Sequence, residues 1–458
     1  MHATMPRHRW RADTFASVHV FAHSLFVCAS IFPNSGLPPR FGSMHRGAGP
    51  RMATKFLVIL LVGLSAGIAV AREKPAGAPP LPAKLFESAE AKRAAAEYHV
   101  KYIAYRKQRD AYEKKASAYW DLVEGKRAER RKKRANGQPV ELSDYVLDQP
   151  PAYSGPAAPT PPPAPPLKRR PKTKQVKAEP LPVVADFLRH AKARFQFAPK
   201  RPATEMDYKR AYARAALAGG ISKEQAVRIY GFEAGGNGTY DVQAGLESKR
   251  PGAKPISTAL GYNQLLIANT IGIMSEHGSI MAAKLEERAK AAKPERRKEL
   301  TRKSAALRRM MKFARSIPYR WSAHVKAAET PKGRALHALN LDVDVGPMLQ
   351  TQKLLDSVKF LRMKGHERPV SAAELEMMNL MGDGNGFDVV TMPAAIRDKV
   401  PTSNFFQRGG YERNPVASRN NVVAALLAAM EKRMEQQATL DGAKQLDAAF
   451  QEALRSTD

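Results

Sequence analysis

Apolar residues in the second half of the chain recur at the three- and four-residue spacing of helices, and strand-like alternation is nearly absent. The pattern runs from about residue 184 to the end. It predicts helices over 184–195, 205–218, 222–233, 264–275, 348–362, 371–381 and 420–454. We therefore expect residues 184–458 to form an all-α, or mainly helical, domain.

A second helical pattern occupies residues 85–140. Residues 85–135 contain no proline, and Tyr98, Tyr105, Tyr112 and Tyr119 follow one another at intervals of seven. This spacing places the tyrosines on one stripe of a helix or short coiled coil. We expect the stripe to pack on a partner, and an aromatic, basic binding surface is the alternative.

Proline-rich and basic segments separate these regions. Residues 72–84 and 141–183 are rich in proline, which predicts a short spacer and a semi-rigid basic linker. Residues 284–315 have a helical pattern with many lysines and arginines and few large apolar residues. We expect this stretch to be an exposed basic helical insertion in the C-terminal domain.

The net charge points to anionic partners. The 458 residues include 75 Lys and Arg against 43 Asp and Glu, a formal charge of +32. The positive field of such a chain attracts nucleic acid, anionic lipid and acidic envelope polymers alike, so the charge alone does not identify the partner. The single cysteine, Cys28, excludes an internal disulfide and a multi-cysteine metal site.

Residues 52–71 resemble an export signal. Lys55 follows Met52, and an apolar run then ends in Ala69-Val70-Ala71, the small-x-small pattern of signal peptidase cleavage. The run is short for a membrane span of about 20 residues, so we expect cleavage and a periplasmic or cell-envelope location, with an uncleaved anchor as the alternative. Residues 1–51 are then expected to be a disordered extension upstream of the true start at Met52.

Glu233 is the first candidate for chemistry. Ser222 and Gln225 have the spacing of a capping box, and glycines from Gly235 onward end the predicted helix, so Glu233 falls in its last turn. The negative end of the helix dipole disfavours an ionised carboxylate and raises its pKa, which suits a general acid. Glutamates end many helices, however, so the position alone is weak evidence.

Two downstream elements strengthen the candidate. They are Ser257-Thr258-Ala259-Leu260-Gly261-Tyr262-Asn263-Gln264 and the glycine-rich run from Leu380 to Val390. Together with Gly231-Phe232-Glu233, their order resembles the soluble lytic transglycosylases of the lysozyme superfamily over roughly residues 205–430. Ala234, Met381 and Gly382 depart from the serine, tyrosine and asparagine of the family pattern, and the interval between Glu233 and Gln264 is longer than usual.

The resemblance implies a lysozyme-like domain that cleaves the bond between N-acetylmuramic acid and N-acetylglucosamine in peptidoglycan. Glu233 would be its single acid and base, closing a 1,6-anhydro ring without a cofactor or metal. Substrate-binding residues would be Ser257, Gly261, Tyr262, Asn263, Gln264 and Met381.

Other interpretations of the residues stay open. Asp241 could act as a second carboxylate in a hydrolytic variant, although an aspartate in a glycine-rich loop more often shapes a turn. The run Asp383–Gly386 fails as a calcium loop because Ala394 stands where the bidentate acid is required. A non-catalytic peptidoglycan-binding scaffold is the main alternative function, and a nucleic-acid binder is the least favoured.

Overall fold

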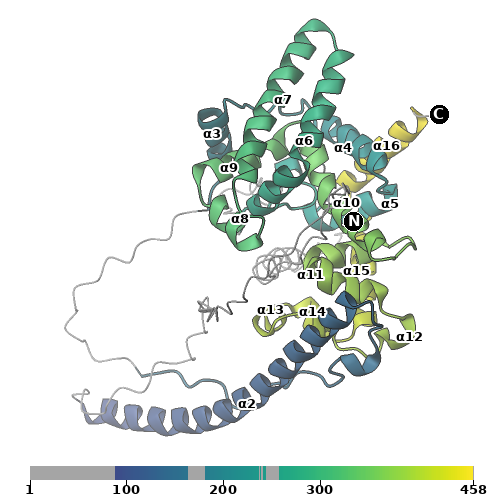
Figure 1. Cartoon of the computed structure of the whole chain (residues 1–458). Helices are drawn as coiled ribbons and strands as arrows, with labels where there is room; N and C mark the ends of the chain where they lie inside the picture. The colour runs from purple at the N-terminus through teal and green to yellow at the C-terminus, as the bar shows by residue number, and fades with distance from the viewer. Residues whose placement is uncertain (1–87, 163–180, 237, 239–240, 244–256, 457–458) are drawn as a thin grey trace, which may run out of the picture. The chain divides into compact units, whose positions relative to one another are not determined.

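The computed structural model describes residues 88–162, 181–236, 238, 241–243 and 257–456 (Figure 1). These residues belong to two compact units. The larger contains Trp120–Pro150 and the described residues from 181 to 456, and the smaller contains residues 88–119 and 151–162. Within the described ranges no helix is both long and apolar enough to cross a membrane. The predicted export signal at 52–71 and the upstream extension lie outside them.

In the smaller unit, the tyrosine stripe lies on helix α2 (Ala89–Ala135). Tyr98 and Tyr105 are buried. Tyr153, from the proline-rich segment, meets Tyr105 and Tyr112 edge-on, with ring centroids 6.4 and 5.3 Å away. The Arg109 guanidinium lies 5.0 Å from the Tyr112 and Tyr153 ring centroids. The stripe therefore packs as expected, and part of the predicted linker is its partner.

The last turns of α2 belong to the larger unit and are fixed there by Arg130. This fully buried side chain donates to Asp388 Oδ2 at 3.1 Å and to the carbonyl oxygens of Asp144 and Asn404. Its guanidinium also lies 4.5 Å from the Tyr145 ring centroid. Burial lowers the pKa of Arg130 to about 10. Every polar group of this contact has a partner, as burial of a charge requires.

The rest of the larger unit is helical, which confirms the mainly helical prediction. The described residues form no β-strand, and two isolated bridges join Leu260 to Leu265 and Pro401 to Val422. The helices are α3 (Val184–Phe195), α4 (Glu205–Gly219), α5 (Lys223–Ala234), α6 (Ile267–Lys290), α7 (Pro294–Arg315), α8 (Trp321–Ala328), α9 (Pro331–His337), α10 (Gly346–Met363), α11 (Ala372–Thr391), α12 (Ala394–Arg397), α13 (Arg408–Glu412), α14 (Pro415–Arg419), α15 (Val423–Ala438) and α16 (Asp441–Arg455).

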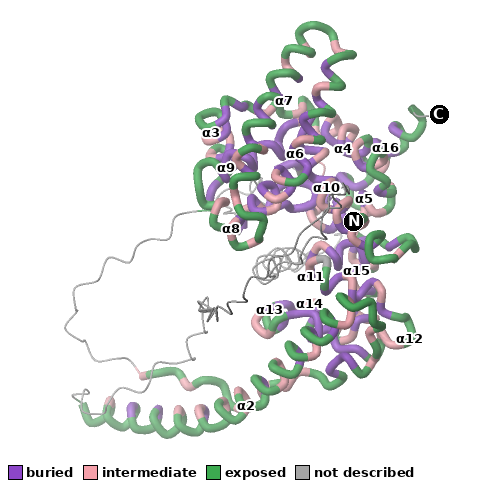
Figure 2. Tube along the Cα trace, in the orientation of Figure 1, coloured by how far each residue is buried: buried purple, intermediate pink, exposed green. Residues whose placement is uncertain are grey.

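Two hydrophobic clusters hold these helices together, and their residues appear as the buried stretches of Figure 2. One lies among α4, α5, α10, α11, α15 and α16, and the other among α3, α6, α7 and α9. In the first, the Tyr262 ring meets Tyr230, Tyr208 and Tyr212 edge-on at 4.6, 5.0 and 5.1 Å between centroids. Edge-on contacts between aromatic rings stabilise a core beyond the free energy gained by burying their apolar surface.

Three of the predicted helices have different limits in the structure. The first begins at Ile267 and runs to Lys290 instead of spanning 264–275. The second continues past residue 381 through a kink at Gly382, whose φ is 75°. The predicted helix 420–454 is two helices, because the Gly442 backbone N–H donates to the Gly236 carbonyl and the chain must approach that loop closely.

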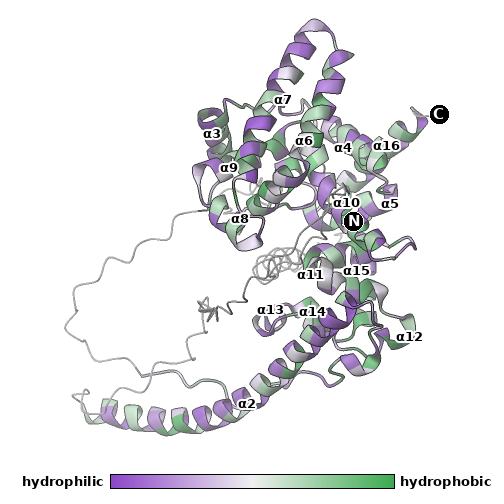
Figure 3. Cartoon of the chain, in the orientation of Figure 1, coloured by the Kyte–Doolittle hydropathy of each residue, from purple (hydrophilic) through white to green (hydrophobic). Residues whose placement is uncertain are grey.

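The basic segment 284–315 is helical, as predicted, but only its outer face is exposed. Leu285, Leu300, Leu307 and Met310 are at most 2% exposed and join the second cluster. Hydrophilic residues occupy much of the remaining surface of α7 in Figure 3. The segment thus forms an amphipathic hairpin with α6 that contributes to the core.

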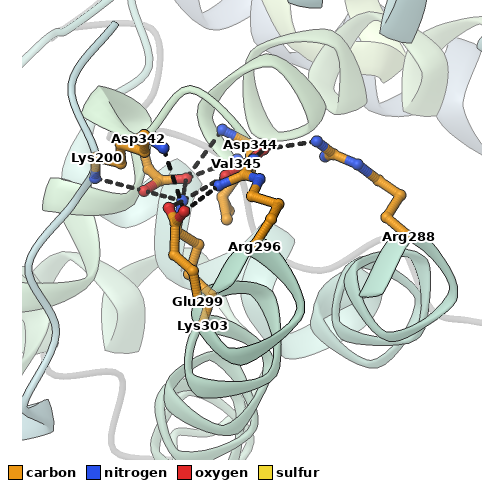
Figure 4. A network of polar contacts seen from close by, with 8 residues as sticks. All are labelled: Lys200, Arg288, Arg296, Glu299, Lys303, Asp342, Asp344 and Val345. Carbon is orange, nitrogen blue, oxygen red and sulfur yellow. Dashed lines mark hydrogen bonds and ion pairs between the residues drawn. The ribbon is translucent and has the colours of Figure 1, made fainter. Parts of the chain in front are cut away.

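A buried ion network ties this hairpin to the chain before α10 (Figure 4). Lys303 Nζ lies 2.9 Å from Asp342 Oδ2 and also pairs with Asp344. The Lys200 backbone N–H donates to Asp342 at 2.7 Å, and Arg288 pairs with Asp344 at 2.6 Å. We call this set, with Arg296 and Glu299, the Lys303 network. It joins three segments that are far apart in the sequence.

Candidate active site

Helix α5 presents Glu233 in its last turn. The Ser222 hydroxyl accepts from the Gln225 backbone N–H at 3.1 Å, and the Gln225 side chain accepts from the Ser222 N–H at 3.0 Å, so the predicted capping box is present. Gly235, in the left-handed conformation with φ 77°, ends the helix. Glu233 is half-buried as a residue, and its Oε1 atom is buried.

Helix α11 places a second acid next to Glu233. The Ser371 hydroxyl caps the helix by accepting from the Glu374 backbone N–H, and Glu376 follows in the first turns. Its side chain is 0% exposed. Asn379 Nδ2 donates to Glu376 Oε1 at 3.2 Å. Because α5 and α11 pack together, the Glu376 and Glu233 carboxyls are close enough for each to shift the pKa of the other.

The two carboxyls cannot both be satisfied as anions. Glu233 Oε1 and Glu376 Oε2 are buried and have no hydrogen-bond partner among the described residues. A proton on one carboxyl lets it donate to the other, which removes one negative charge and provides the missing bond. The pair is therefore expected to hold at least one proton at neutral pH.

The pKa directions agree with this geometry. Burial raises the pKa of Glu233, and the hydrogen bond from Glu376 partly opposes that rise. Burial and the neighbouring charge of Glu233 raise the pKa of Glu376 well above its usual range, with smaller opposing effects of Asn379 and Lys353. The sequence predicts a raised pKa for Glu233 because of the helix dipole, whereas burial is the main cause of the rise in the structure.

The predicted substrate-binding turn packs beside α5. Its bridge from Leu260 to Leu265 encloses Gly261, with φ 85°, and Gln264, with φ 43°. Tyr262, against Tyr230 one turn before Glu233, links this turn to the helix that carries the acid. The structure thus brings two of the three sequence elements, Gly231–Glu233 and Ser257–Gln264, next to each other.

Several polar groups of this turn already have internal partners. The Tyr262 hydroxyl donates to Glu205 at 2.6 Å, and Asn263 Nδ2 donates to the Gln350 carbonyl at 2.6 Å. Gln264 Nε2 donates to the Gly261 carbonyl at 2.8 Å, and the Ser257 hydroxyl accepts from the Ala259 N–H. These groups stabilise the turn, which limits what they can offer a substrate.

The remaining predicted residues lie on two other elements. Met381 is 1% exposed and packs in the same cluster as Phe232, immediately before the kink at Gly382. Asp241 begins the short 3-10 turn Asp241–Gln243, and its side chain is outside the described part of the chain. Within that described part, no group of three His, Cys, Asp or Glu could hold a metal ion.

Glu376 is the site residue that the sequence prediction missed. Around it, Ala372, Ala373, Leu375, Met377, Met378 and Leu380 are all apolar. A helix that is apolar on every side is buried on every side, so an acid within it must also be buried. That signal was present in the sequence, but it does not reveal which residue the acid faces.

Comparisons of the chain with protein-family models, with curated proteins and with solved structures find no match. The likeness to soluble lytic transglycosylases thus stays a prediction from the sequence motifs. The chemistry of the site has to be inferred from the positions and environments of its own residues, above all Glu233 and Glu376.

Proposed function

We propose that this protein is a lytic transglycosylase that cleaves peptidoglycan glycan strands, with Glu233 as the acid and base. The observation that carries the proposal is Glu233, half-buried at the end of α5, whose carboxyl has a pKa raised by burial. A carboxyl that keeps its proton near neutrality can protonate a glycosidic oxygen. The motif order and the predicted export signal supply the substrate class.

The proposed reaction returns Glu233 to its starting state. Its proton moves to the leaving oxygen as the bond from that oxygen to the sugar C1 breaks. The Glu233 carboxylate then takes the proton of the same sugar's C6 hydroxyl, and the C6 oxygen bonds to C1. The product is a 1,6-anhydro sugar, no water is consumed, and no cofactor is required.

The test is mass spectrometry of purified peptidoglycan digested with the wild type and with Glu233→Gln. We expect 1,6-anhydromuropeptides from the wild type alone. Glu224→Gln is the matched control, because Glu224 is an exposed acid on the same helix, and it should cleave like the wild type. Reducing-end products would indicate hydrolysis and favour Asp241 as a second carboxylate, and an active Glu233→Gln would refute the assignment.

The internal hydrogen bonds of Tyr262 and Asn263 favour a second candidate, a non-catalytic peptidoglycan-binding scaffold. In a scaffold these residues keep the fold without contacting a reacting sugar. Sedimentation with insoluble peptidoglycan separates the two functions. Binding that is equal for the wild type and Glu233→Gln, with no release of muropeptides by either, would support the scaffold.

A further inference from the structure

We infer that Glu376 is a positioning residue that stays protonated and donates a hydrogen bond to the Glu233 carboxylate. This inference rests on the proposed function for its role in the reaction. The arrangement of the two acids on α5 and α11 suggests it, and it assigns different tasks to two carboxyls that a sequence pattern would treat alike.

The two acids differ in their contact with solvent. Glu376 is 0% exposed, whereas Glu233 is half-buried. An ion loses more solvation at the deeper position, so Glu233 is the first of the two acids to ionise and Glu376 keeps its proton when Glu233 is charged. Asn379 occupies Glu376 Oε1, which leaves the unpartnered Oε2 to carry the proton.

The charged groups on the surrounding helices agree with this assignment. On α10, Lys353 is half-buried, and its charge only partly offsets the burial of Glu376. On α15, Glu431 contacts both helices, but through Arg228 at 3.0 Å and the Ser371 hydroxyl. On α11 itself, Glu374 is held by Arg368 and Arg397. Glu376 is thus left to interact with Glu233.

The hydrogen bond has a specific consequence for the reaction. After Glu233 gives its proton to the leaving oxygen, it is an anion in a poorly solvated place. The Glu376 O–H donates to that anion and stabilises it until the C6 hydroxyl returns a proton. Hydrogen bonds to charged groups are strong enough for their loss to slow a reaction about 10- to 100-fold.

Two variants test the inference in the full chain. Glu376→Gln keeps a neutral donor, so we expect kcat within a few-fold of the wild type. Glu376→Leu removes the donor, so kcat should fall about 10- to 100-fold with little change in KM. The limb of the pH profile set by Glu233 should move to higher pH, because its anion loses a hydrogen bond. Equal loss in both variants, or an unmoved limb, would overturn the positioning role.

Infrared spectroscopy provides a readout that does not depend on activity. Above the pH limb set by Glu233, where that acid is ionised, we expect a carbonyl stretch of a buried protonated carboxylic acid in the wild type, absent in Glu376→Gln and retained in Glu233→Gln. If the wild type fails to cleave peptidoglycan but shows this band, the proposed function is refuted and the donor assignment stands. If the band is missing, or is lost only with Glu233, the assignment to Glu376 is wrong.

Discussion

Replacing Lys303 by methionine should destabilise the larger unit strongly. Lys303 is 5% exposed and pairs with Asp342 and Asp344, whose side chains are 0% and 2% exposed. Burial alone would lower the pKa of Lys303, but the two aspartates outweigh it and raise the pKa. Removing the cation leaves two acids buried with less compensation, which costs about 3–5 kcal/mol for a buried pair. Arg288 and Arg296 still reach Asp344, so Asp342 should account for most of the loss.

The assay is thermal unfolding of the full chain followed by helical circular dichroism. We expect Lys303→Met to lower Tm by on the order of 10 °C. Lys298→Met is the matched control, because Lys298 is exposed on the same helix, and its Tm should hardly change. Adding Asp342→Asn to Lys303→Met should restore part of the loss. If the unfolding free energy of Lys303→Met lies within about 1 kcal/mol of that of the control, the network stabilises the fold no more than a surface ion pair does.

Two further substitutions test other parts of the larger unit. Glu376→Gln should be more stable than the wild type at neutral and alkaline pH: a raised pKa makes the native acid increasingly unfavourable as pH rises above its unfolded-state pKa, so the advantage should vanish toward low pH. Denaturant titrations at several pH values measure this, and a constant difference would contradict it. Gly386→Ala should cost about 1–3 kcal/mol, since its Cβ would lie 2.5 Å from Met378 Cα. A Cβ at Gly384 would meet no atom within 4 Å, so Gly384→Ala should not lower the stability. Equal Tm values for the two variants would refute the close contact at Gly386.

Local signals in the sequence predicted the helices well where the helix ends are fixed by nearby residues. The Ser222–Gln225 capping box and Gly235 predict the limits of α5 to within one residue, because these contacts join neighbours in the chain. The break between α15 and α16 was missed, because it depends on the approach of Gly442 to Gly236, about two hundred residues earlier in the chain. Contacts of this kind leave no periodic signal.

The candidate site shows the same division. Glu233 could be found from its place at a helix end, and the burial of Glu376 from its apolar neighbours. Their meeting depends on how α5 packs on α11, which neither local pattern contains. The internal hydrogen bonds of Tyr262 and Asn263 likewise depend on Glu205 and Gln350, whose roles no short motif predicts.

The Lys303 network also bears on the order of folding. The α6–α7 hairpin joins neighbours in sequence and can form early, because closing a short loop costs little entropy. Asp342 reaches Lys303 across 39 residues and Lys200 across 142. Contacts of such long separation generally form late. We therefore expect Lys303→Met to speed unfolding far more than it slows refolding. The network would then form after the hairpin and act mainly by lowering the unfolding rate of the native state.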